Sequence, residues 1–232
     1  MGISSALLDK HGPANNMSKK TQVYELLKNR IVHDELKPQQ YLNELDLCEE
    51  LGISKTPVRE ALQHLERDRL VVIVPNKGCF VASISLDLIR EIFEIREVFE
   101  CAAARFAARM SSRKQFEELL DTHESFKAIG DAEIRQALVS GYQIHQIIVD
   151  ASGNSFLSWY YNSILSQILR IRIHFLSRFE SSRLHATSGE HRAILKAIIE
   201  GNEDEAEKAM RAHLVNSLVS IGHLMLSNRK DL

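Results

Sequence analysis

Apolar residues recur at helical spacing in two short segments near the N-terminus, and a glycine separates them. Leu45, Leu47 and Leu51 give the first segment an apolar face, and Gly52 is the residue type that ends a helix in a left-handed conformation. The second segment starts almost at once and is expected to turn Val58, Ala61, Leu62 and Leu65 inward. This pattern predicts a helix-turn-helix.

The opposite face of the second helix is polar near its amino end, where it carries Lys55, Thr56, Arg59, Glu60 and Gln63. Ser54 or Thr56 is expected to cap this helix, and Pro57 fits its first turn. In a helix-turn-helix this end enters the major groove, where arginine pairs with guanine and a hydroxyl binds phosphate or base. The pattern therefore favours DNA binding, although a bare helix-turn-helix is equally common in all-α proteins without that function.

A β-hairpin is predicted directly after this helix pair. The β-branched run 71–74 and a strand at 80–81 flank the turn Pro75-Asn76-Lys77-Gly78, and a further helix is expected at 21–33. Lys77 at the tip of the hairpin would contact the phosphate backbone or the minor groove. Together these elements predict a winged helix-turn-helix. This arrangement indicates DNA binding much more specifically than the helix pair alone.

The apolar pattern from residue 85 onward is helical throughout. The first helix of this region has a long stripe at steps of three and four residues, formed by Leu88, Ile92, Ile95, Phe99, Ala102, Phe106 and Met110. Further helices are predicted at 113–129, 132–151, 156–179, 190–200 and 203–226. The predicted fold is mainly α, with an N-terminal winged helix-turn-helix that contains a small β-hairpin, followed by an all-α antiparallel helical bundle.

Length and charge refine this picture. The 232 residues suffice for two domains, and we expect a flexible leader at 1–16, a DNA-binding domain at 17–83 and an effector-binding and dimerisation domain at 84–228. The net charge is only −2, and residues 17–82 hold as many acidic as basic side chains. DNA affinity must then come from a local patch, and symmetric dimerisation would double its contacts.

The cysteines and the apolar runs indicate a cytoplasmic protein. Cys48, Cys79 and Cys101 are scattered and lack the Cys-x-x-Cys spacing of zinc ribbons, which favours a reducing compartment. No run approaches the roughly 18 to 20 apolar residues of a membrane span, and the N-terminus lacks the order of a signal peptide.

Three of the ten histidines lie on apolar stripes of different predicted helices. They are His145 beside Ile148, His191 beside Ile194, and His213 beside Met210. Three converging imidazoles suit zinc, nickel, copper or iron(II) and leave open positions for water or a ligand carboxylate. The alternative is that each is a core histidine satisfied by a hydrogen bond, and composition alone favours that alternative.

The stretch from Gly52 to Leu62 resembles the core signature of the GntR family of bacterial transcription regulators. The resemblance implies a dimeric DNA-binding regulator that binds a palindromic operator. Its expected effect on transcription is repression. It also implies operator contacts by Ser54, Lys55, Thr56, Arg59, Lys77 and Gly78, beside Gln63 on the same face. Many relatives carry an arginine where this chain has Leu45, so the contact made there is not expected here.

The C-terminal region resembles the ligand-binding domain called FCD, through Arg96 and Glu100, His145 before the segment 151–154, Glu190-His191, and His213. This resemblance implies a divalent metal, zinc or nickel, bound by His145, His191 and His213. Gly141 stands where metal-binding members have an aspartate ligand. Loss of that ligand is expected to weaken the site, to shift its preference, or to leave it empty until an effector carboxylate completes the shell.

The same resemblance implies an effector cavity for a small organic acid. Arg96 is the leading candidate to bind the acid, with Tyr142, Arg170 and Arg172 as further candidates. The alternative for Arg96 is an ordinary ion pair with Glu100, one helical turn away. A competing function is a metal-dependent hydrolase that uses the three histidines, but no carboxylate shares the His145 stripe to serve as a general base.

Overall fold

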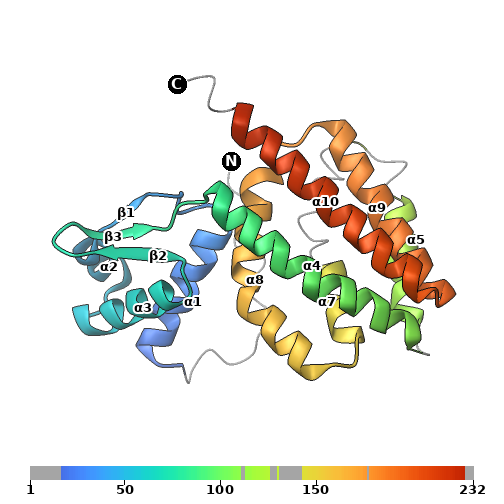
Figure 1. The fold of residues 1–232 in the computed structure, drawn as a ribbon. Helices are drawn as coiled ribbons and strands as arrows, with labels where there is room; N and C mark the ends of the chain where they lie inside the picture. The colour runs from blue at the N-terminus through green and yellow to red at the C-terminus, as the bar shows by residue number, and fades with distance from the viewer. Residues whose placement is uncertain (1–16, 111–112, 126–129, 131–142, 177, 228–232) are drawn as a thin grey trace. The chain divides into compact units, whose positions relative to one another are not determined.

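A computed structural model describes residues 17–110, 113–125, 130, 143–176 and 178–227. For residues 123–125 it describes only the backbone. The chain divides into two compact units, with the division after Ser83 and a short segment, Val32–Asp34, assigned to the second. We call them the N-terminal unit and the helical unit (Figure 1). None of the helices in these described ranges combines the length and apolar character that a membrane span needs.

The N-terminal unit is a winged helix-turn-helix. Its elements are α1 (Lys19–Val32), β1 (Tyr41–Leu42), α2 (Glu44–Leu51), α3 (Lys55–Arg67), β2 (Val71–Val74) and β3 (Gly78–Val81). The Asn43 side chain caps α2 by accepting a hydrogen bond from the Leu45 amide at 2.9 Å. Gly52 ends α2 with φ of 62°, the left-handed conformation predicted for it.

The sheet has three antiparallel strands in the order β1-β3-β2. The hairpin is confirmed, with Val74 paired to Gly78 across the turn, and Asn76 takes the left-handed conformation there with φ of 61°. Strand β3 starts two residues earlier than predicted, at Gly78, and the short β1 was not predicted at all. A two-residue strand has no hydrophobic alternation to reveal it.

The core of the N-terminal unit contains the inward face predicted for α3. Val58, Ala61, Leu62 and Leu65 are all buried. The prediction for α2 was partly wrong, because Leu47 is buried whereas Leu45 is 51% exposed. Leu45 lies in the first turn of α2, two residues from Leu47 and thus on a different side of the helix.

The helical unit confirms the predicted all-α architecture. Its elements are α4 (Leu86–Arg109), α5 (Lys114–Ser125), α7 (Gln143–Ala151), α8 (Ser155–Leu176), α9 (Ser181–Glu200) and α10 (Glu203–Ser227). Helix α10 packs along α4 and α9, as Figure 1 shows. Helix α9 begins nine residues before the predicted start, since Ser181 and Ser182, read as a loop in the sequence, form its first turn. The predicted helix at 132–151 is described only from Gln143 onward.

The buried face of α4 differs from the predicted stripe. Ile95 and Met110 are 36% and 43% exposed, and the buried positions instead include Ile89, Arg96 and Glu100. Four buried alanines at 103, 104, 107 and 108 continue this face. Alanines allow neighbouring helices to approach closely, so the buried side of α4 passes from large residues such as Ile89 and Phe93 to small ones toward its C-terminus.

Candidate functional site

The amino end of α3 presents polar side chains to the surface of the N-terminal unit. Ser54, Lys55, Thr56, Arg59 and Gln63 are all exposed. Ser54 occupies the N-cap position with extended backbone, but its side chain makes no capping hydrogen bond, contrary to the predicted cap. Its hydroxyl is therefore not engaged at the helix terminus.

A surface hollow brings α3 and the hairpin together. Lys55, Arg59, Gln63 and Gly78 all line it. Arg59 Nε donates a hydrogen bond to Glu44 Oε2 at 2.8 Å, although the Arg59 side chain remains 62% exposed. This hydrogen bond raises the pKa of Arg59, so its guanidinium is charged and held at the start of α3.

The tip of the hairpin supplies the remaining predicted DNA contacts. Lys77 is exposed in the turn. Gly78 has φ of 105°, and a Cβ atom at this position would lie 2.5 Å from the Tyr41 ring. Gly78 therefore has a structural role in the turn, whatever contact its backbone makes with a partner.

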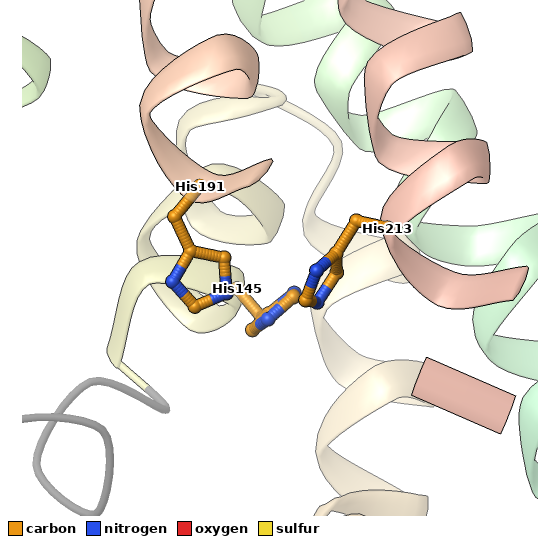
Figure 2. A group of neighbouring side chains, drawn as sticks. All are labelled: His145, His191 and His213. Atoms are coloured by element: carbon orange, nitrogen blue, oxygen red, sulfur yellow. The ribbon is translucent and has the colours of Figure 1, made fainter. Parts of the chain in front are cut away.

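In the helical unit, the side chains of His145, His191 and His213 meet. They come from α7, α9 and α10, and Figure 2 shows the three rings turned toward one another. The ring centroids lie 4.7 to 5.3 Å apart, and one possible ligand atom from each ring lies within 4.8 Å of the others. All three side chains are buried. We call this group the histidine cluster.

Two carboxylates, one buried and one partly buried, fix the orientation of two of these rings. His145 Nδ1 lies 2.7 Å from Glu100 Oε2, and His213 Nδ1 lies 2.8 Å from Glu190 Oε2. An ionised carboxylate only accepts hydrogen bonds, so Nδ1 of each ring carries the proton and donates it. The lone pair of each ring is then on Nε2.

The electrostatics keep the carboxylates charged and the rings neutral. Burial lowers the pKa of His145 to about 4 despite the neighbouring carboxylate, and burial also lowers the pKa of His213. Burial alone would raise the pKa of Glu190, but hydrogen bonds from His213 and Arg183 lower it to about 2. Neutral imidazole is the form that coordinates a metal ion.

The histidine cluster has the chemistry of a metal site. Nε2 of His145 is buried and has no hydrogen-bond partner among the described residues. Metal-binding histidines usually donate their other ring nitrogen to a carboxylate, as His145 and His213 do here. Two nitrogens bound to one zinc ion are at most about 4.2 Å apart, so a small inward movement of the rings would suffice.

Glu100 is the centre of a wider buried network. It is fully buried and forms an ion pair with Arg96 at 2.7 Å from Nε to Oε1. The Tyr161 hydroxyl donates to the same Oε1 at 2.9 Å. Burial opposes the charge of Glu100, but Arg96 and His145 together hold its pKa far below the ordinary value. The ion pair considered as the alternative role of Arg96 is therefore present.

A cavity of about 50 Å³ adjoins the histidine cluster and is lined by His145 and His213. Its polar wall also contains three arginines, Arg96, Arg172 and Arg183. Arg170 is buried in α8 but is not among the lining residues, whereas Arg172, two positions along the helix, is. Tyr142 and Gly141 lie outside the described residues.

Sequence reasoning missed Glu100 and Glu190 as partners of the histidines, and Arg183 as a cavity residue. Glu190 was adjacent to a candidate ligand, but its bond to His213 at 2.8 Å requires α9 and α10 to be packed, whereas its bond to Arg183 at 2.7 Å lies within α9. Glu100 had a usable signal, because it lies on the α4 stripe of Ala103, Ala104 and Ala107 at helical spacing.

Two known protein families match the chain, one in the N-terminal unit and one in the helical unit. The family described as "Bacterial regulatory proteins, gntR family" matches residues 19–81. The family described as "FCD domain" matches residues 91–216, which is more than half of the chain. The first match covers the winged helix-turn-helix, and the second covers the histidine cluster and all but two of the residues that line the cavity.

Similar proteins are transcription regulators. The HTH-type transcriptional repressor RspR of Escherichia coli K12 is 28% identical over 209 residues, with 89% of this chain and 90% of that protein covered. The crystal structure of a GntR transcriptional regulator from Rhodococcus sp. RHA1 has a TM-score of 0.72 at 25% identity and covers 88% of this chain and 98% of that one. The metal-free FCD domain of TM0439 has a TM-score of 0.52 at 22% identity, covers 63% of this chain and 99% of that one, and shows the fold alone.

Proposed function

This chain belongs to the GntR family of bacterial transcription regulators and carries an FCD domain, and from this premise we propose that it is a homodimeric repressor controlled by a small ligand. We propose that residues 17–83 bind a palindromic operator and that residues 84–228 dimerise and bind the ligand. The protein would act in the cytoplasm, where bacterial operators lie.

The observation that carries the DNA-binding proposal is the shared surface of α3 and the hairpin. Lys55, Arg59 and Gln63 line one hollow together with Gly78. Their neighbours in the sequence, Ser54, Thr56 and Lys77, are exposed. Arginine and glutamine can form bidentate hydrogen bonds to guanine and adenine, and the shorter side chains can bind phosphate. We propose these seven residues as the operator contacts.

The test is selection of DNA by the purified full-length protein from a pool of random duplexes. We expect enrichment of a two-fold symmetric sequence whose half-sites are centred about one helical turn apart, the spacing of two symmetric recognition helices. Enrichment of no sequence above the starting pool would contradict operator recognition by this unit.

Lys77 is expected to contribute affinity without sequence preference. Replacing Lys77 by alanine should weaken binding to operator and to unrelated duplex by a similar factor, because phosphate contacts do not distinguish bases. In a dimer, the slope of log affinity against log salt should also become shallower by about 2, since each subunit loses one phosphate contact. Titration of labelled duplexes by fluorescence anisotropy at several salt concentrations measures both effects. A loss confined to the operator would instead assign Lys77 to base recognition.

For the helical unit we propose a divalent metal, zinc or nickel, held by His145, His191 and His213. The buried Nε2 of His145 and the carboxylates behind His145 and His213 support this assignment. A bound ion would supply a link among three helices and open positions for an anionic ligand. We propose that a small organic acid occupies the adjoining cavity, with Arg96 among its binding residues.

Glu100 is proposed to position His145 for the metal. Replacing Glu100 by glutamine should lower the metal affinity by about 10- to 100-fold, the usual cost of losing such a carboxylate partner. Competition with a coloured chelator measures the affinity without reference to DNA binding. Glu94 is an exposed glutamate of the same helix, and Glu94→Gln is the matched control. Equal metal affinities of the two variants would remove Glu100 from this role.

The chain is a transcription regulator and not an enzyme, as its family membership establishes. Nothing in the comparisons supports the hydrolase that was considered as an alternative. The carboxylates found beside the histidines, Glu100 and Glu190, accept hydrogen bonds from ring Nδ1 atoms and from arginines. These hydrogen bonds explain the presence of both carboxylates beside the histidines, so no role as a general base is needed.

A further inference from the structure

Glu44 and Arg59 form an ion pair on the surface proposed to bind DNA. Glu44 is the first residue of α2, and Arg59 lies in the second turn of α3. Both line the hollow that also contains Lys55, Gln63 and Gly78. The Glu44 side chain is 35% exposed and that of Arg59 is 62% exposed. A carboxylate therefore lies among the residues proposed to contact the operator, although DNA phosphates repel it.

The pair occupies one edge of the Arg59 guanidinium. Arg59 Nε donates a hydrogen bond to Glu44 Oε2 at 2.8 Å. An arginine has five side-chain N–H groups, so the four on Nη1 and Nη2 are left for another partner. A guanidinium reaches the O6 and N7 atoms of guanine either with Nε and one Nη or with both Nη atoms. Because Glu44 occupies Nε, Arg59 is left with the second geometry.

The pair also restricts where the Arg59 side chain points. An arginine without such a partner samples many rotamers, and it can carry its guanidinium to a phosphate as well as to a base. The bond to Glu44 selects the rotamers that keep the guanidinium beside the start of α2. Ordering the side chain before DNA arrives lowers the entropic cost of the base contact. An exposed ion pair is weak in the free protein, but it strengthens when DNA excludes water from the groove.

The charge of Glu44 opposes binding that does not use this base contact. A carboxylate near the groove is repelled by the phosphates and loses water when DNA docks. On the operator, the contact of the positioned Arg59 with guanine offsets this cost, whereas unrelated DNA provides no such contact. Glu44 thus weakens non-specific binding more than specific binding, which is how a repulsive group raises specificity.

From this geometry we propose that Glu44 is a positioning residue, which restricts Arg59 to one base contact and so sets the sequence specificity of the N-terminal unit. This inference rests on the proposed function, since it requires α3 to enter the major groove with Arg59 at a guanine. It goes beyond that function because it assigns selectivity to a residue of α2 that acts through Arg59.

The test measures affinity base pair by base pair, with the purified full-length protein and the operator that it selects. Each base pair is replaced in turn in both half-sites, and fluorescence anisotropy gives the loss for the wild type, Arg59→Ala and Glu44→Ala. The base pair that Arg59→Ala no longer distinguishes is the one that Arg59 reads. We expect Glu44→Ala to reduce discrimination at this base pair by at least about 5-fold, the combined effect of one exposed ion pair in each subunit. Discrimination at the other base pairs should be unchanged.

Two further variants separate the hydrogen bond from the charge. Glu44→Gln removes the charge, but its amide oxygen still accepts from Arg59 Nε, so it should keep more discrimination than Glu44→Ala. Equal losses in the two variants would overturn the role of the hydrogen bond. Glu49→Ala is the matched control, because Glu49 is an exposed glutamate on another side of α2, and it should discriminate every base pair as the wild type does. If melting curves show that Glu44→Ala does not fold, a smaller loss confined to the same base pair in Glu44→Gln carries the test.

The outcomes separate this inference from the function on which it rests. If Glu44→Ala keeps full discrimination, or loses it equally at all base pairs, the inference is wrong while the docking of α3 still stands on the result for Arg59→Ala. A loss at a base pair other than that of Arg59 would show that Glu44 reads a base itself, which also overturns the inference. If Arg59→Ala discriminates every base pair as the wild type does, the proposed docking fails and the inference fails with it.

Discussion

Replacing Arg59 by alanine is expected to reduce the affinity for the selected operator by at least about 30-fold. Each bidentate contact between arginine and guanine contributes about 1 to 3 kcal/mol of discrimination, and a symmetric dimer loses two of them. Arg59 is exposed on α3, and its ion pair with Glu44 lies at the surface, so the fold of the variant should be unchanged. Fluorescence anisotropy with operator and unrelated duplexes, together with a melting curve, measures both effects.

The matched control is Arg67→Ala. Arg67 is an exposed arginine of the same helix, but it is the last residue of α3 and lies far from the end proposed to enter the groove. Its loss should change operator affinity only slightly and to the same extent as affinity for unrelated DNA. If the two variants lose operator affinity equally, the proposed docking of α3 is wrong and Arg59 contributes only general charge.

Replacing His191 by alanine is expected to abolish metal binding and to lower the melting temperature. His191 is completely buried, and its ring centroid is 5.3 Å from that of His145 and 4.7 Å from that of His213. A ligand present at about 1,000 times its dissociation constant stabilises a protein by about 4 kcal/mol, and the variant would lose this contribution. Elemental analysis and melting curves with and without EDTA measure the two effects.

The chelator distinguishes loss of metal from loss of packing. Any truncation of a buried side chain leaves a void that lowers stability, so a lower melting temperature alone proves little. EDTA should lower the melting temperature of the wild type and should leave that of His191→Ala unchanged. His185 lies exposed on the same helix, and His185→Ala should behave as the wild type. If EDTA has the same effect on His191→Ala as on the wild type, His191 is not a ligand.

The winged helix-turn-helix was predictable because its signals are local. The left-handed glycine, the inward spacing on α3 and the β-branched run before the turn are each encoded within a few residues. Strand β1 was not predictable in this way, since Tyr41 and Leu42 become a strand only by pairing with β3. The long helices were found from apolar periodicity, but the start of α9 was not, because two serines were read as a loop.

The site was predictable to the extent that it depends on single helices. Each histidine of the cluster lies on an apolar stripe of its own helix, so their burial could be inferred, and the structure adds that they meet. The partnerships of Glu100 with His145 and of Glu190 with His213 join different helices. A single sequence carries no direct signal for such pairs. Arg170 and Arg172 were both candidates from the sequence, but only Arg172 lines the cavity. Which of the two faces it depends on the rotation of α8, which its flanking apolar residues define only loosely.

The metal content of the purified full-length protein tests the central claim about the helical unit most directly. We predict one zinc or nickel ion per chain by elemental analysis after dialysis, removed by EDTA with a fall in melting temperature and restored by adding the ion. A protein that stays metal-free after incubation with either ion and dialysis would contradict this claim. His145, His191 and His213 would then act only as hydrogen-bonding groups beside an arginine-lined cavity.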